Sequence, residues 1–476
     1  MTSVADMRFL LPTPTETVDA LGESQLAETL SAHAPAARPS LVAAADRRHT
    51  GEAARLQYES LLLEGAPSAR LLTARGYTVR RYLSLPSVAE PSLLIPSAAG
   101  AVGAYALGNW TFPRTRLRRL RNRGARTLLA CGLRPPLAPV VTVAARRAGL
   151  PFLVQAAVDM RLVPPNVAFF VRSGGLDALS RSTFFLFEAN TDRPHWLLKF
   201  ARVRDYAQPF DSDERGLALV CAAAEDVRRH APRLIGRLEV DGLHASVETA
   251  AVGRPLADQL RLPGDRAAKR VLVDAVASWI LALGRATRRD DQFELERVRL
   301  AALLAEYHDD PRIPRDLSDR LPPLPTVVQH NDIGCWNVIG DADSFVVVDW
   351  ESAHAHGLPL WDLWYFLLDA LAAVDGAAPE DREAHFAALF RGELATSSVL
   401  FGWTRRMVED LGIPPDAVAV IAMLCWLHHG RSHVRREEAR RLHARPPSGS
   451  TPNPFPYAHV WLADRQLGTA WSRWLA

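Results

Sequence analysis

Lysine is almost missing from this sequence of 476 residues. Of its 56 basic residues only Lys199 and Lys269 are lysines, which leaves 54 arginines. A skew of this size is typical of a codon bias toward arginine. Lysine and arginine present their charge to phosphate in different geometries. Each of the two lysines is therefore a position where an ammonium group is a candidate for a specific role.

Cysteine and long apolar runs are also scarce. The longest apolar stretches, Val271–Gly284 and Leu358–Val374, contain aspartate and are too short or too polar to cross a bilayer. The first residues show no basic segment followed by an apolar core, so we expect no secretory signal. The four cysteines lie far apart, with no C-x-x-C pair: Cys131, Cys221, Cys335 and Cys425. This spacing excludes the familiar zinc sites and a disulfide scaffold and suits a reducing compartment. With the expected lack of a signal and of a membrane span, it leads us to expect a soluble, cytoplasmic protein.

The remaining composition is that of an ordinary globular protein. Hydrophobic residues make up 48% and charged residues 23%. The net charge of +3 argues against a dedicated nucleic-acid binder. The length predicts two or three domains.

The first 155 residues show only weak periodicity in the spacing of their apolar residues. We expect residues 1–50 to be partly disordered and residues 51–155 to form a small α/β region of unknown role. Within that region the sequence predicts a helix over Gly51–Glu64 and strands over Tyr77–Leu85 and Ser92–Ile95, and Pro139–Ala144 is an apolar stretch. The arginine-rich stretch Arg114–Arg126 favours a solvated helix face, with a grip on a phosphate-rich partner as the alternative.

From residue 156 on, apolar runs and turn residues indicate strands and helices more clearly. Strands are predicted over Val167–Arg172, Ser182–Glu188 and Trp196–Val203, and the acidic start at Asp211 predicts a long helix toward His230. We expect a strand-rich lobe over 156–252 and a helical lobe over 253–476. Within this helical lobe, residues 326–351 are not expected to be helical.

The candidate catalytic residues are polar side chains within residues 326–351. Val338–Ile339 and Phe345–Val348 read as two short strands around the turn at 340–344. If they form an antiparallel hairpin, Asn337 and Asp349 face each other at its open end, where two oxygen ligands could share one hard cation. Asp332 lies five residues upstream of Asn337. A carboxylate base beside a magnesium site is what transfer of a phosphoryl group to a hydroxyl requires.

The spacing His330-x-Asp332-x-x-x-x-Asn337, followed by Asp349-x-Glu351, resembles the aminoglycoside phosphotransferase and choline kinase family. Gly357-Leu-Pro and Asp362 resemble the continuation of that motif. The resemblance covers about residues 160–440. It implies an α+β, bilobal, protein-kinase-like fold with a β-rich N-lobe and a helical C-lobe, here behind an additional N-terminal α/β region.

The resemblance also implies roles in the N-lobe. Lys199, in the third strand, would contact the α- and β-phosphates of ATP, and Glu214 would be its ion-pair partner, with Glu225 as the alternative. Ser173, Gly174 and Gly175 would form the loop over the phosphates. The stretch from Val247 to Leu256, which includes Glu248, resembles the inter-lobe linker on the nucleotide side.

In the C-lobe, Asp332 would accept or orient the proton of the acceptor hydroxyl, and His330 would brace the catalytic loop. Asn337 and Asp349 would hold Mg²⁺, with Glu351 as a further ligand or a surface residue. Asp362 would bond to the backbone of the loop. Asn331 stands where the family most often has glycine.

These roles predict an ATP- and Mg²⁺-dependent kinase of a small-molecule hydroxyl. The alternative is an inactive, nucleotide-binding scaffold. The acceptor stays open among aminoglycosides, macrolides, choline and sugars, because residues 351–400 carry a net charge of −6 and residues 401–476 carry +4. The tryptophans near the site (Trp336, Trp350, Trp361 and Trp364) favour core packing, with an aromatic cage for choline as the alternative. The oligomeric state also stays open.

Overall fold

A computed structural model describes most of the chain. It covers residues 60–443 apart from 67, 75, 89–90, 99, 112–114, 137, 174–179 and 341–343. It also covers residues 7, 9–14, 19–21 and 41–44 near the start and residues 460–462, 464 and 467 near the end. Most of the predicted segment 1–50 lies outside these residues. The chain forms two units, residues 1–207 with 234–250 and residues 208–233 with 251–476.

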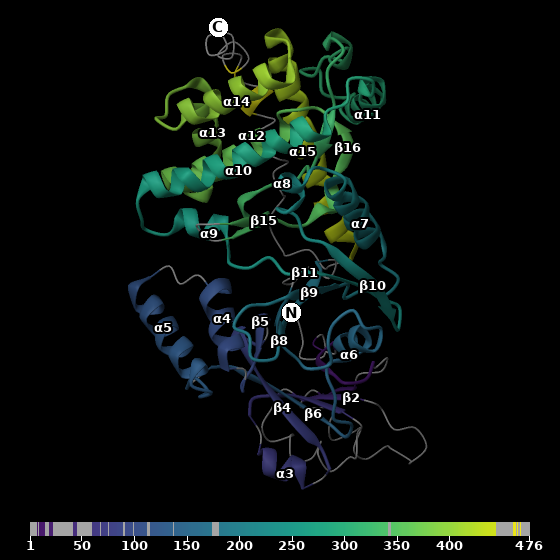
Figure 1. The fold of residues 1–476 in the computed structure, drawn as a ribbon, viewed down its shortest axis with the longest axis vertical. Coiled ribbons are helices and arrows are strands. Elements are labelled where there is room, and N and C mark those ends of the chain that lie inside the picture. Colours follow the sequence, from purple (N-terminus) through teal and green to yellow (C-terminus); the bar gives the residue numbers. More distant parts are fainter. Residues whose placement is uncertain are drawn as a thin grey trace. The chain divides into compact units, whose positions relative to one another are not determined.

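The first unit is built on one sheet of eleven strands (Figure 1). In chain order the strands are β1 (Asp19–Leu21), β2 (Leu41–Ala44), β3 (Ser60–Glu64), β4 (Thr78–Pro86), β5 (Pro91–Pro96), β6 (Val140–Ala145), β7 (Val167–Arg172), β8 (Ser182–Glu188), β9 (Trp196–Phe200), β10 (Leu234–Val240) and β11 (Leu243–Thr249). Their order across the sheet is β1-β2-β3-β6-β4-β5-β7-β8-β9-β11-β10. β1, β2 and β3 run parallel, and every other pair is antiparallel.

The N-terminal region continues the sheet of the predicted N-lobe. β5 pairs with β7 through Leu93–Arg172 and Leu94–Val171, and the N–H of Ser173 donates to the Ser92 carbonyl at 3.0 Å. The division found in the structure therefore differs from the predicted one, because the boundary expected at residue 155 falls inside the first unit. The segment 208–233, expected in the N-lobe, belongs to the second unit.

Each face of this sheet carries its own core, because successive side chains of a strand point to opposite faces. Phe170, Phe185 and Phe187 lie on one face, where the Phe170 and Phe185 rings stack at 4.5 Å. Helices α4 (Gly100–Trp110) and α5 (Arg116–Ala130) cover this face (Figure 1). The other face packs Phe169, Phe184 and their neighbours against α6 (Phe152–Asp159). A short helix, α3 (Ala69–Thr73), precedes β4.

Two helices expected from the sequence differ in the structure. The helix predicted over Gly51–Glu64 is a strand at Ser60–Glu64, and residues 51–59 lie outside the described residues. A continuous apolar run such as Leu61–Leu63 suits a strand buried on both faces, which overrides the helical pattern. The long helix predicted from Asp211 to His230 is two helices, α7 (Gln208–Cys221) and α8 (Glu225–Arg228).

The second unit is mostly helical. Besides α7 and α8, its helices are α9 (Leu256–Arg261), α10 (Arg266–Thr287), α11 (Phe293–Ala305), α12 (Trp361–Asp375), α13 (Arg382–Arg391), α14 (Ser397–Leu411) and α15 (Val418–His443). Its strands are β12 (Arg254–Pro255), β13 (Val327–Gln329), β14 (Val338–Gly340), β15 (Phe345–Val347) and β16 (His354–Gly357). The single 3₁₀ turns are η2 (Ser318–Arg320), η3 (Cys335–Asn337), η4 (Trp350–Ser352), η5 (Pro379–Asp381) and η6 (Pro415–Ala417). α12 lies at the centre, in contact with α9, α10, α13, α14 and α15.

The structure confirms the α+β class, with a strand-rich first unit and a helical second unit. Within the described residues, no helix combines the length and the apolar character needed to span a membrane.

Because the N-terminal region and the later strands share one sheet, we predict the effect of removing residues 1–159. A chain of residues 160–476 loses Leu94, Val141 and Phe152 from the core that also holds Phe184, and it leaves β7 as an open sheet edge. We expect this fragment to aggregate and to show no cooperative thermal transition, because an open apolar edge strand pairs with other chains. Size-exclusion chromatography and circular dichroism against the full chain measure this. A soluble monomeric fragment with a cooperative transition would contradict it.

Candidate active site

The predicted catalytic loop lies between β13 and η3 in the second unit. β13 pairs with β16, which places His330 at the end of a short buried strand. Asn331 has a positive φ of 62°. Asparagine tolerates this left-handed conformation better than most residues, and glycine adopts it freely. This conformation explains why asparagine can stand where the family most often has glycine.

The carboxylate of Asp362 holds this loop by two hydrogen bonds. It accepts the backbone N–H of His330 at 2.6 Å and that of Asn331 at 2.8 Å. The expected bond between Asp362 and the loop backbone is thus confirmed. Asp362 lies in the first turn of α12, where the helix dipole favours a negative charge. Burial raises the pKa of Asp362, and the contacts with His330 and Asn331 oppose that rise.

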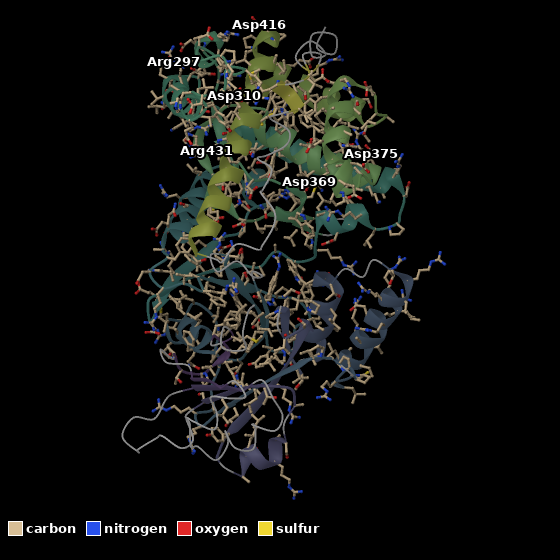
Figure 2. The ribbon with its side chains drawn as sticks, turned by 180° about the vertical axis from the view of Figure 1, so that it is seen from behind. Arg297, Asp310, Asp369, Asp375, Asp416 and Arg431 are labelled. Atoms are coloured by element: carbon tan, nitrogen blue, oxygen red, sulfur yellow. The ribbon has the colours of Figure 1, made fainter. Side chains whose placement is uncertain are left out.

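Two further side chains of α12 contact the same loop, and neither was predicted from the sequence. The Tyr365 hydroxyl donates to Asp332 Oδ1 at 3.2 Å, and Asp369 Oδ2 accepts the N–H of Cys335 at 3.0 Å. Residues 362, 365 and 369 share one face of the helix because they are three and four positions apart. That spacing, starting from Asp362, is the signal that could have found them. Asp369 also pairs with Arg382 at 3.1 Å and lies on α12 with Asp375 (Figure 2).

The His330 ring bridges two segments of the site. Its Nδ1 accepts the N–H of Asp332 at 3.2 Å, and its Nε2 lies 3.0 Å from the Val348 carbonyl. A neutral ring with its hydrogen on Nε2 makes both bonds. These contacts tie the loop to the end of β15, as expected of a bracing residue.

Asn337 is tied to Asp332. Its Nδ2 donates to the Asp332 carbonyl at 2.8 Å and lies 3.5 Å from Asp332 Oδ2. The amide oxygen of Asn337 then remains as the ligand atom for a cation. Asp332 and Asn337 are both half-buried, so the loop presents them at the surface of the unit.

The hairpin of β14 and β15 differs by one residue from the predicted register. Val338 pairs with Val347, and the N–H of Val348 donates to the Asn337 carbonyl at 2.8 Å. Asn337 therefore faces Val348, and the expectation that it faces Asp349 is wrong. Asp349 follows at once with a positive φ of 72°, so the chain turns sharply at this residue.

Helix α7 supports that turn from within the same unit. The buried Asp213 carboxylate accepts the N–H of Trp350 at 2.8 Å. A Cβ at Gly216 would clash with the Trp350 carbonyl and would lie 2.9 Å from the Trp350 and Ala353 side chains. Neither Asp213 nor Gly216 could be assigned this role from the sequence, because the acidic stretch 211–214 indicated a helix start and, through Glu214, a partner for Lys199.

Lys199 lies in the first unit, on β9, and forms an ion pair with Glu248 of β11. The distance is 3.0 Å, and the side chains are 10% and 1% exposed. Ser246 is directly opposite Lys199, so Glu248, two residues on, projects from the same face. Glu248 thus lies inside a strand and not in a linker. The chain leaves the first unit directly after Ala250, within the predicted linker stretch.

The remaining N-lobe predictions are only partly within the described residues. Ser173 follows β7 and is buried, whereas Gly174 and Gly175 lie outside the described residues. Glu214 is exposed on α7 of the second unit, and its pairing with Lys199 stays a prediction.

Asn337 and Asp349 carry the types of donor atom that a magnesium ion prefers. Mg²⁺ prefers oxygen ligands and is held by one or two protein groups together with phosphates and water. Asn337 and Asp349 supply an amide oxygen and a carboxylate. Among the residues that the structure describes, no three or more histidine, cysteine, aspartate or glutamate side chains gather to hold a metal. Asn337, Asp349 and Glu351 as metal ligands therefore stay predictions.

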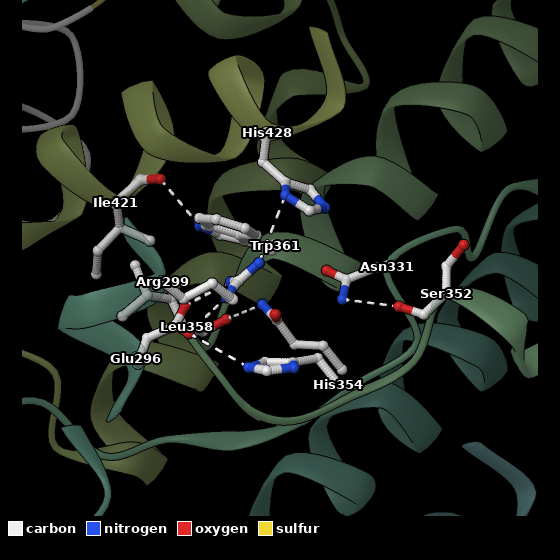
Figure 3. A network of polar contacts seen from close by, with 10 residues as sticks. Glu296, Arg299, Asn331, Ser352, His354, Leu358, Trp361, Ile421 and His428 are labelled. Atoms are coloured by element: carbon white, nitrogen blue, oxygen red, sulfur yellow. Dashed lines mark hydrogen bonds and ion pairs between the residues drawn. The ribbon is translucent and has the colours of Figure 1, made fainter. Parts of the chain in front are cut away.

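A polar network fixes the start of α12 (Figure 3). The buried Glu296 carboxylate accepts two bonds from Arg299, at 2.7 and 2.5 Å, and the Arg299 guanidinium lies 5.0 Å from the centre of the Trp361 ring. Trp361 Nε1 donates to the Ile421 carbonyl at 3.1 Å. The Asn331 amide donates to the Ser352 carbonyl at 3.1 Å, which ties the loop to η4.

The tryptophans near the site are mainly core residues. Trp350, Trp361 and Trp364 are fully buried. Trp336 is 45% exposed, and the Arg261 guanidinium lies 5.3 Å from the centre of its ring. Packing, and not an aromatic cage, is thus the role of three of the four.

A strand-rich unit with a buried lysine–glutamate pair and a helical unit with a His-x-Asp loop are thus the parts that the resemblance implies. Residues 177–406 match the sequence profile of the phosphotransferase enzyme family, which confirms the resemblance that the motifs indicate.

Solved structures with which the chain aligns include small-molecule kinases. A choline/ethanolamine kinase family protein from Mesorhizobium loti is 14% identical, over 68% of this chain and 98% of its own, with a TM-score of 0.33. Aminoglycoside-3'-phosphotransferase of type VIII is 15% identical, over 67% and 98%, with a TM-score of 0.30. A putative fructosamine-3-kinase from Haemophilus somnus 129PT is 11% identical, over 68% and 96%, with a TM-score of 0.32. A search of curated proteins finds no match.

The Asp362 bonds generate a stability prediction. In Asp362→Asn one carboxylate oxygen becomes an NH₂ group, so one buried N–H of the loop loses its acceptor. We expect a loss of about 2 kcal/mol in the free energy of unfolding, as for a buried donor left unsatisfied. Urea unfolding measures it. Asp290→Asn, which removes an exposed pair with Arg288, is the control and should cost less than about 1 kcal/mol. Equal losses in the two variants would refute the role of Asp362.

Gly216 generates a second prediction, with a glycine of α14 as its control. Gly216→Ala forces α7 away from Trp350 and should cost about 2 kcal/mol through overpacking. Gly402→Ala adds a methyl group with no atom within 4 Å and should stabilise by about 0.5 kcal/mol, because alanine restricts the unfolded chain. Urea unfolding of both variants gives the sign of each change. The close approach of α7 is disproved if Gly216→Ala also stabilises.

Proposed function

We propose that this protein is an ATP- and Mg²⁺-dependent phosphotransferase that moves the γ-phosphate of ATP to a hydroxyl group of a small molecule. The observation that carries the proposal is the orientation of Asp332. Tyr365 holds one of its carboxylate oxygens, and Asn337 holds its backbone carbonyl. Its side chain is half-buried at the end of a fixed loop, as a group that must receive a substrate hydroxyl has to be. The family match over residues 177–406 supports the same reaction class.

Each residue then has a defined task. Asp332 orients the acceptor hydroxyl and takes its proton as the phosphoryl group transfers. Asn337 and Asp349 hold the Mg²⁺ ion, which neutralises charge on the phosphates. Lys199 contacts the α- and β-phosphates, and Glu248 fixes its ammonium group through the 3.0 Å ion pair. Ser173, Gly174 and Gly175 would form the loop over the phosphates. His330, Asp362 and Tyr365 position the loop.

The acceptor is a small molecule with a free hydroxyl. The names of two structural neighbours, a choline/ethanolamine kinase family protein and an aminoglycoside-3'-phosphotransferase, suggest the first compounds to screen, which are choline, ethanolamine and aminoglycosides. Conversion of ATP to ADP that depends on one of these compounds identifies the acceptor.

Nucleotide binding tests the proposal before any acceptor is known. A thermal-shift titration with ATP and Mg²⁺ should stabilise the wild type by about 2.7 kcal/mol at 100 times the dissociation constant, a rise of a few degrees. Asp349→Asn should lose the part of the shift that depends on Mg²⁺, and Lys199→Met should weaken binding at least tenfold. Asp332→Asn should keep the shift, since Asp332 faces the acceptor.

Lys269→Met is the matched control, because Lys269 is the other lysine of the chain and lies on α10. It should bind ATP like the wild type. If Lys199→Met and Lys269→Met behave alike, Lys199 is not a phosphate ligand. If the wild type shows no shift, the enzyme proposal fails and the scaffold alternative takes its place.

A further inference from the structure

The positive charge of this chain is concentrated in one stretch. Residues 91–158 contain ten arginines and no aspartate or glutamate, whereas the whole chain has a net charge of only +3. Six of these arginines lie on α5, at positions 116, 118, 119, 121, 123 and 126. Among the residues that the structure describes, none of these six forms an ion pair with a carboxylate. The charge of the helix is therefore available to an external partner.

α5 is anchored to the first unit along one narrow face. Leu129 is buried against Gly103 of α4, and Ala125 packs against the same core. The Asn122 amide donates to the Leu107 carbonyl of α4 at 3.2 Å. Positions 122, 125 and 129 follow the helical repeat, so they define the inner face of α5.

The opposite half of the helix is exposed and combines leucine with arginine. Leu117 is 77% exposed and Leu120 is 67% exposed, and they lie one turn apart. Gly124, one turn further, has open space around its Cβ position. We call Leu117 and Leu120, with Arg116, Arg119, Arg121 and Arg123, the outer face of α5. Leu133, just beyond the helix, is also 56% exposed.

We propose that the outer face of α5 docks on an anionic lipid bilayer. Cationic side chains around exposed apolar ones match the two layers of such a surface, the acidic headgroups and the start of the acyl chains. A nucleic acid matches only the arginines, because its phosphate backbone offers no apolar partner to two exposed leucines. The leucines thus favour the bilayer. This docking does not depend on the proposed kinase reaction.

Co-sedimentation of the full chain with vesicles tests the proposal. The wild type should bind vesicles of phosphatidylcholine with phosphatidylglycerol at about 0.1 M salt, where charges within about 10 Å still interact. It should not bind phosphatidylcholine alone. Arg116→Gln/Arg119→Gln/Arg123→Gln should lower the affinity at least tenfold, since each arginine near an anionic surface contributes about fivefold. Glutamine keeps a similar helix propensity, so α5 should stay folded.

Leu117→Gln/Leu120→Gln leaves the charge unchanged and should lower the affinity about tenfold. Its control is Leu295→Gln/Val298→Gln, a pair of exposed apolar residues with the same spacing on α11, where glutamates accompany the arginines. The charge control is Arg288→Gln/Arg312→Gln/Arg320→Gln, which removes three exposed arginines that each pair with aspartate. Both controls should bind like the wild type.

Three results would overturn the proposal. The first is no binding of the wild type to anionic vesicles. The second is equal loss in the charge control and in the α5 arginine variant, since net charge alone would then explain binding. The third is an unchanged leucine variant together with RNA or DNA binding that the arginine variant loses, which would assign the outer face to nucleic acid. Circular dichroism of each variant shows that the helix is intact.

Discussion

The site depends on one buried carboxylate. Asp362 accepts the N–H groups of His330 and Asn331 and so fixes the loop at the point where its backbone becomes left-handed. The next turns of α12 hold Asp332 and Cys335 through Tyr365 and Asp369. One helix face therefore aligns the whole loop, and the network around Glu296 and Trp361 aligns the helix. A charge buried without its partners is unfavourable, so the bonds to Asp362 stabilise the loop and the start of α12 together.

The first unit shows how extra chain can be added to a small lobe. Strands β7 to β11 form a sheet whose edge strand, β7, carries unpaired N–H and C=O groups unless another strand covers it. Here β5 covers that edge, and the sheet continues through β4, β6 and β3. Because the cores on both faces run across the junction, the N-terminal region and the strands near Lys199 share one packing arrangement.

The sequence predicted those parts of the structure that short-range patterns determine. Strands β7 and β8 begin and end at the predicted residues, because continuous apolar runs rich in aromatic residues stand between turn signals in the sequence. The loop residues could be found from their spacing. The hairpin register was missed by one residue, because the ladder pairs Gly340 with Phe345 and so shifts the centre of the turn by half a residue. The strand at Ser60–Glu64, the bond of Asp213 and the partner Glu248 depend on segments distant in sequence, which local patterns do not report.

The rarity of lysine affects how the protein can be modified. Acylation, ubiquitination and amine-directed crosslinking all require a side-chain ammonium that can lose its proton, and arginine does not substitute for it. Lys199 is nearly enclosed and paired with Glu248. Lys269 is half-buried on α10, and burial, together with the nearby Arg266, lowers its pKa. Amine chemistry on side chains is thus directed to one helix, and a reagent carried on Lys269 would report on α10 alone.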